Sequence, residues 1–101
     1  MAFDMLFNGN HESIEHHEEF LFTLAGEHEE RYPELLAVWE AFYDGPRISA
    51  RQAGALVHEL AALLIQNGGL ANKPLAAVVA RLSPFLSLAC SSNQEVRCTS
   101  D

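Results

Sequence analysis

The fold class depends on the interpretation of residues 11–30, which read HESIEHHEEFLFTLAGEHEE. Asn10 or Ser13 can cap a helix at the start of this stretch, and glutamates in its first turn suit the helix dipole. At 100° per residue, one face collects Ile14, His17, Leu21, Leu24, Ala25 and His28. The stretch therefore predicts a first helix over residues 11–30, with His17 and His28 buried or half-buried on its apolar face.

Residues 33–91 predict further helices that are separated by turn signals. Pro33 opens a second helix, and Trp39 and Phe42 lie in the middle of its apolar stripe, so we expect both to be largely buried. A third helix begins after Ser49, which caps it, and ends at Asn67-Gly68-Gly69. A fourth begins near residues 73–74, and Pro84 either kinks it or separates a short fifth helix.

Two short segments at the ends of the chain have the patterns of strands. Residues 2–7, AFDMLF, form a short aromatic run before Asn8-Gly9, and residues 95–99 alternate between polar and apolar side chains. The two segments can pair into a ribbon, which needs helices to pack on. We therefore predict a mainly α, compact four- or five-helix bundle-like domain, with the ribbon of N- and C-terminal segments as an optional addition. Residues 1–101 form a single globular helical domain in this interpretation.

Charge is distributed unevenly along the chain. The first 44 residues carry eleven acidic side chains and one basic one, whereas the remaining 57 carry three acidic and five basic ones. The net charge of −8 repels phosphate backbones, so we expect no nucleic-acid partner, and it attracts a basic protein. We predict a small acidic protein-binding module that engages a basic partner protein through an acidic, His-bearing helical face. Its partner-binding residues are Glu12, Glu15, Glu18, Glu19, Glu27, Glu29 and Glu30.

Metal binding or pH sensing is one alternative function. The histidines and glutamates of residues 11–19 have helical spacings of three or four, which suit a divalent metal or a group that titrates near about pH 6. However, neither His-Glu-x-x-His nor Glu-x-x-His occurs in the chain. We therefore predict no metal site and no cofactor.

A homo-oligomeric structural domain without a ligand is the other alternative. Phe20 and Phe22 flank the apolar face of the predicted first helix on either side. One helix in a monomer of this size can hardly bury both rings, so we expect a weak or moderate homodimer with Phe20 and Phe22 at its interface.

The remaining features of the sequence exclude several classes of function. Its serines and Cys90 lie in no Gly-x-Ser-x-Gly or comparable frame, so we predict that the protein is not an enzyme; a dyad of Cys90 with a histidine is the alternative that the sequence leaves open. No run approaches about 18 apolar residues and no signal peptide is present, so we expect no membrane partner. Two cysteines, Cys90 and Cys98, are typical of thiols in the reducing cytoplasm. In size and charge alone the chain is similar to small acidic helical immunity proteins, which inhibit basic toxins; this likeness transfers no residue.

Overall fold

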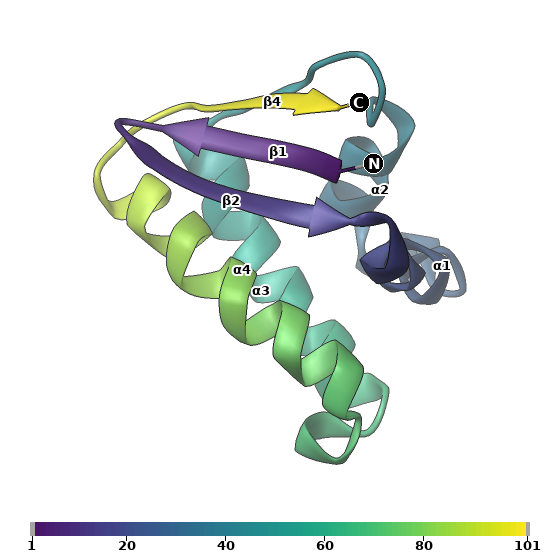
Figure 1. The fold of residues 1–101 in the computed structure, drawn as a ribbon. Coiled ribbons are helices and arrows are strands. Elements are labelled where there is room, and N and C mark those ends of the chain that lie inside the picture. Colours follow the sequence, from purple (N-terminus) through teal and green to yellow (C-terminus); the bar gives the residue numbers. More distant parts are fainter. Residues whose placement is uncertain (1, 101) are drawn as a thin grey trace.

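A computed structural model describes residues 2–100 and has a mixed α/β fold (Figure 1). Within this range an antiparallel sheet has the strand order β2-β1-β4-β3, where the strands are β1 (Ala2–Phe7), β2 (Asn10–Glu15), β3 (Arg47–Ile48) and β4 (Val96–Ser100). The accompanying α-helices are α1 (Phe20–Gly26), α2 (Pro33–Glu40), α3 (Ala50–Gln66) and α4 (Lys73–Ser91). Met1 and Asp101, the ends of the predicted domain 1–101, lie outside the described residues.

The prediction of a mainly α bundle is wrong, because no single helix forms over residues 11–30. Residues 10–15 form β2, His16–Glu18 form one 3-10 turn, and only α1 is α-helical. The physical reason is the turn at Asn8 and Gly9, whose φ angles of 45° and 81° are both positive. Such a two-residue type I′ turn sends the chain straight back along β1. Ile14 then lies opposite Phe3, and both side chains are buried.

Alternation along each strand gives the sheet an inner and an outer face. The inner face is apolar and faces the helices; its buried side chains include Phe3, Met5, Phe7, Ile14 and Val96. The outer face carries the alternate residues, among them Asp4, Leu6, His11, Arg97 and Thr99. The terminal segments form strands and pair with each other, as their patterns indicate, but within a four-stranded sheet and not as a separate two-stranded ribbon.

The helices α3 and α4 form a long antiparallel pair beneath the sheet (Figure 1). Ser49 caps α3 as predicted, because its Oγ accepts a hydrogen bond from the backbone N–H of Gln52 at 3.1 Å. Helix α4 is continuous through Pro84, so no separate fifth helix forms there. By length and composition alone α4 is apolar enough to cross a membrane, but its buried residues belong to the core that it shares with α3 and the sheet.

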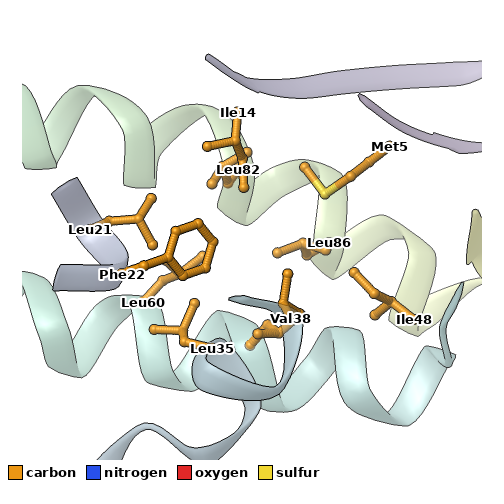
Figure 2. Close-up of a pocket in the computed structure, with 11 residues that line it drawn as sticks. Met5, Ile14, Leu21, Phe22, Leu35, Val38, Ile48, Leu60, Leu82 and Leu86 are labelled. Atoms are coloured by element: carbon orange, nitrogen blue, oxygen red, sulfur yellow. The ribbon is translucent and has the colours of Figure 1, made fainter. Parts of the chain in front are cut away.

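Side chains from the sheet and from α1–α4 meet in one apolar core, which Figure 2 shows in close-up. They surround a void of about 20 Å³ that has no polar lining, formed by Met5, Ile14, Leu21, Phe22, Leu35, Val38, Ile48, Leu56, Leu60, Leu82 and Leu86. A water molecule there would find no hydrogen-bond partner. The void is therefore a packing feature of the core and offers no site for a polar ligand.

The turn between β1 and β2 generates the first testable prediction. Gly9→Ala is expected to destabilise the fold by about 1–2 kcal/mol, because a Cβ is disfavoured at positive φ. An added Cβ at Gly9 meets no atom within 4 Å, so the cost comes from the backbone alone. Gly26→Ala is the matched control, since its Cβ also meets open space and its φ lies outside the left-handed region. The control is expected to be neutral or stabilising by about 0.5–1 kcal/mol in urea unfolding; equal stability of both variants would contradict the prediction.

Candidate functional site

The seven glutamates predicted to bind a partner do not share one helix face. Glu12 and Glu15 belong to β2, Glu18 belongs to the 3-10 turn His16–Glu18, and Glu19 precedes α1. The other three, Glu27, Glu29 and Glu30, follow α1 and are exposed. The structure therefore divides the predicted acidic face into two groups with different surroundings.

Two members of the first group, Glu12 and Glu18, bind Arg81 of α4, which connects this helix to β2 and to the 3-10 turn. Its Nε donates to Glu12 Oε1 at 2.7 Å, and its Nη1 and Nη2 donate to Glu18 Oε2 and Oε1 at 2.8 and 2.7 Å. Nη2 also donates to the Ser13 carbonyl oxygen at 2.8 Å. Hydrogen bonds from Arg81 hold the pKa of Glu18 below its usual range, and Glu18 is only 8% exposed. We name Arg81, Glu12 and Glu18 the Arg81 cluster.

The Arg81 cluster covers the free edge of the sheet, where β2 has a neighbour on one side only. The Ser13 carbonyl is bonded to Arg81, and the Ser13 N–H donates to Glu12 Oε1 at 3.3 Å. Further along the same edge, the Glu15 N–H donates to Glu18 Oε1 at 2.9 Å. Unpaired backbone groups at a sheet edge are a template for pairing with another chain. Glu12 and Glu18 therefore have a structural role in protecting this edge.

A second carboxylate, which is half-buried, supports α2 from outside that helix. Glu59 of α3 accepts hydrogen bonds from the backbone N–H groups of Glu34 at 3.0 Å and of Leu35 at 2.9 Å. These donors have no partner within the first turn of a helix, so Glu59 serves as its cap. Burial raises the pKa of Glu59 above its usual range, although the two backbone hydrogen bonds oppose this shift. Glu59 fixes where α2 begins.

The histidines are scattered over the surface and do not form a cluster. His17 and His28 are both exposed, so the prediction that they are buried or half-buried is wrong. The side chains of His11 and Asp4 are 2.9 Å apart on the outer face of the sheet, and His16 lies 3.3 Å from Glu19. Among residues 2–100, no group of three or more His, Cys, Asp or Glu side chains is placed to hold a metal ion.

Two aromatic rings lie exposed at the end of α2. Trp39 is 38% exposed and Tyr43 is 62% exposed, whereas Phe42 between them is buried. The prediction that Trp39 is largely buried is therefore wrong; Leu35 and Val38 of α2, together with Phe42 in the turn after it, form the ridge that enters the core. Trp39 lies at the edge of this ridge, with its ring centroid 4.9 Å from that of Phe22 in a stacked arrangement. The Phe42 ring lies 5.1 Å from Trp39 and 5.3 Å from Tyr43.

The same contacts bear on the predicted oligomer interface. Phe22 is 3% exposed and stacks beneath Trp39, so its ring belongs to the core and is not available to another subunit. Phe20 is half-buried and packs against the core from its margin. The two phenylalanines therefore do not form one exposed patch.

Exposed carboxylates lie at both ends of α2, and the aromatic pair is at its C-terminal end. Glu40 and Asp44 lie next to Trp39 and Tyr43 in the sequence, and the other end of α2 follows Glu27, Glu29 and Glu30. None of these five side chains forms an ion pair within residues 2–100, and Arg31 is the only lysine or arginine in residues 27–44. We name the exposed acidic and aromatic side chains of this segment the acidic aromatic surface: Glu27, Glu29, Glu30, Trp39, Glu40, Tyr43 and Asp44.

Exposed carboxylates beside exposed aromatic rings are suited to recognition of cationic side chains. Carboxylates and aromatic rings in this arrangement do not activate a nucleophilic side chain. Burial raises the pKa of the Cys98 thiol in the core to about 12, so this thiol stays protonated near neutral pH. No family model matches the chain, and no match was found among curated proteins or among solved structures. The geometry of the acidic aromatic surface is therefore the basis on which a function can be proposed.

Removal of the Arg81 guanidinium is predicted to destabilise the fold. Breaking a fully buried ion pair costs about 3–5 kcal/mol, and because the Arg81 side chain is 38% exposed we expect about 2 kcal/mol for Arg81→Met. The folded-state pKa of Glu18 is lowered, so its contribution is present above the ordinary value of 4.5 and is lost as the pH falls through the lowered pKa.

The pH dependence is measured with Glu18→Gln. The difference in unfolding free energy between wild type and this variant is expected to shrink between about pH 7 and about pH 3. Glu27→Gln, at an exposed glutamate without an ion pair among the described residues, is the matched control and is expected to change little. A difference that stays constant with pH would contradict a stabilising charge on Glu18.

The pH dependence at Glu59 is predicted to have the opposite sign. Its folded-state pKa is raised, so protonation favours the folded state below the ordinary value, and this gain is lost as the pH rises through the raised pKa. Relative to Glu59→Gln, wild type is therefore expected to become more stable on acidification. Glu59→Ala is expected to lose about 1–2 kcal/mol at neutral pH because α2 loses its cap. Urea unfolding across the pH range measures both effects, and parallel pH profiles for the Glu18 and Glu59 variants would contradict the assignment.

Proposed function

We propose that this protein is a small acidic binding module that engages a basic partner protein through the acidic aromatic surface. One observation carries the proposal: Trp39 and Tyr43 are exposed beside carboxylates that have no ion pair within the described residues. Exposed apolar rings lose the stabilisation of burial, whereas Trp and Tyr are enriched among the residues that dominate binding energy at protein interfaces.

The packing beneath Trp39 supports the proposal. Its ring stacks on Phe22 and lies against Phe42, and both of these are buried. A ring held in this way has few conformations to lose when a partner covers it. The exposed face of Trp39 also offers a cation–π contact to an arginine or lysine of the partner.

The distribution of charge supports a basic partner. The proposal keeps Glu27, Glu29 and Glu30 from the sequence-based prediction and adds Glu40 and Asp44, which border the aromatic pair. Glu12 and Glu18 are left out because the Arg81 cluster uses both carboxylates. Surface carboxylates around an aromatic centre accelerate the encounter with a cationic partner and favour it over acidic proteins.

An inhibitor of a basic enzyme or toxin would use such a surface to bind its target. The similarity to immunity proteins, in size and charge alone, suggests this kind of partner. We place the interaction in the cytoplasm, where the two free cysteines remain thiols. Protein recognition, and not catalysis, is the activity proposed.

The test uses Trp39 itself as the reporter, because it is the only tryptophan in the chain. A basic partner is first captured from cells that express the protein, then purified and titrated while Trp39 fluorescence is followed. Trp39→Phe with Tyr43→Ala, followed by calorimetry, is expected to weaken binding about 100-fold, as hot-spot truncations do. The double variant Glu40→Gln and Asp44→Asn is expected to slow association and to reduce its salt dependence.

The matched control is the double variant Ile65→Ala and Leu70→Ala. These residues are 77% and 82% exposed; Ile65 lies in the last turn of α3 and Leu70 in the 3-10 turn Gly69–Ala71 that follows, outside the acidic aromatic surface. The control is expected to bind like wild type. Equal binding by the aromatic variant, or loss of binding in the control alone, would overturn the proposal.

A further inference from the structure

Two arginines face each other on the outer side of the sheet. Arg47 of β3 is the direct cross-strand partner of Arg97 of β4, and both side chains are exposed. Directly opposite like charges in a sheet are destabilising. The chain has only six lysines and arginines and a net charge of −8, so an acidic residue opposite one arginine would be the more common pairing by composition. Stability alone therefore does not account for this pair.

The two arginines border a shallow hollow of about 290 Å³, which is open to solvent. Thr99 follows Arg97 on the same face of β4, and Leu6 of β1 lies opposite Arg97 on the other side. The remaining wall is the backbone of Gly45 and Cys98. Gly45 has a φ of +59°, and a Cβ there would approach the Cys98 carbonyl oxygen to 3.3 Å, so glycine keeps this wall in place.

The neighbouring carboxylates do not neutralise the pair. Arg47 Nη1 donates to Glu95 Oε1 at 3.0 Å, in an ion pair whose side chains are 68% and 50% exposed. Such exposed pairs contribute little and exchange readily with other anions. Within residues 2–100, Arg97 has no ion pair, and Asp4, which lies opposite Thr99, contacts His11 at 2.9 Å. The exposed Arg97 guanidinium thus donates no hydrogen bond to another side chain among residues 2–100.

We infer that this hollow binds the phosphate group of a small phosphate monoester through Arg47, Arg97 and Thr99. A carboxylate presents one edge of two oxygens and so satisfies one guanidinium in the bidentate manner. A phosphate monoester has three terminal oxygens and about two negative charges near neutral pH, so it can engage two guanidinium groups together. The Thr99 hydroxyl donates to a phosphate oxygen, and Leu6 provides an apolar contact for the ester group.

This arrangement links binding to stability in a specific way. Without a ligand, repulsion between Arg47 and Arg97 costs stability, and a bound dianion removes that cost. Replacement of Arg97 by an uncharged residue is therefore expected to raise the melting temperature of the free protein while abolishing the response to phosphate. A purely structural arginine would behave in the opposite way, because its removal would lower the melting temperature.

The experiment measures thermal unfolding and amide NMR shifts of the full chain with inorganic phosphate and, separately, with phenyl phosphate. Chloride at matched ionic strength controls for screening. Either phosphate is expected to raise the melting temperature of wild type and to shift the signals of Gly45 and Thr99. Arg97→Gln and Thr99→Val are expected to bind at least about 10-fold more weakly. Arg51→Gln, at an exposed arginine on α3 outside the hollow, is the matched control and is expected to bind like wild type.

The comparison of the two probes identifies the source of the phosphate. Tighter binding of phenyl phosphate, lost in Leu6→Ala, supports an ester with an apolar group, whereas equal binding restricts the site to the phosphate group itself. The inference is overturned if neither probe shifts the Gly45 and Thr99 signals at about 10 mM, a concentration that saturates even a weak site. It is also overturned if all variants respond equally, or if Arg97→Gln lowers the melting temperature and still responds to phosphate.

Discussion

The turn at Asn8-Gly9 is the constraint on which the rest of the structure depends. Because both residues take positive φ, the chain reverses within two residues, and the register of β2 against β1 is fixed. A shift by one residue would place Ile14 on the outer face and leave Phe3 without its cross-strand partner. With residues 10–15 in the sheet, the chain that remains before Pro33 forms only the short α1 and two 3-10 turns.

The same turn creates a requirement that is met by a residue far away in the sequence. Placing β2 at the edge of the sheet leaves its outward backbone groups without strand partners, and Arg81 of α4 supplies the guanidinium that organises their protection. Glu18 is charged in this role, and its hydrogen bonds from Arg81 outweigh its burial. At Glu59 burial outweighs two backbone hydrogen bonds, because no basic side chain contributes. The pKa of Glu18 is therefore lowered because its partner is a cation, and the pKa of Glu59 is raised because its partners are neutral backbone groups.

Sequence patterns could predict the elements whose signals are local. The cap at Ser49, the end of α3 at Asn67-Gly68-Gly69 and the strand pattern of residues 2–7 each lie within a few residues of the structure they specify. Residues 10–15 contain one apolar side chain, Ile14, so neither helical nor strand periodicity can be established there, and the acidic residues fit a helix N-terminus equally well. Strand β3 has only two residues, which is too short for any period. Strand β2 is specified by the Asn8-Gly9 turn that precedes it, a local hairpin signal that a helix over residues 11–30 disregards. Strand β3 is specified by its pairing partner β4, which a local pattern does not contain.

The candidate site was predictable to a similar extent. Exposure of Glu27, Glu29 and Glu30 follows from a charged segment between helices, but the pairing of Glu12 and Glu18 with Arg81 joins residues more than sixty positions apart. The exposure of Trp39 depends on which side of α2 the rest of the fold leaves uncovered. The spacing of apolar residues along a helix does not show which residue at the edge of its apolar face stays exposed. The turn at Asp44 and Gly45 joins the two proposed surfaces, because Asp44 belongs to the acidic aromatic surface and Gly45 lines the hollow beside Arg97. A phosphate bound in the proposed hollow would add negative charge next to the surface proposed for a basic partner, and linkage would then require each ligand to favour the other by the same factor.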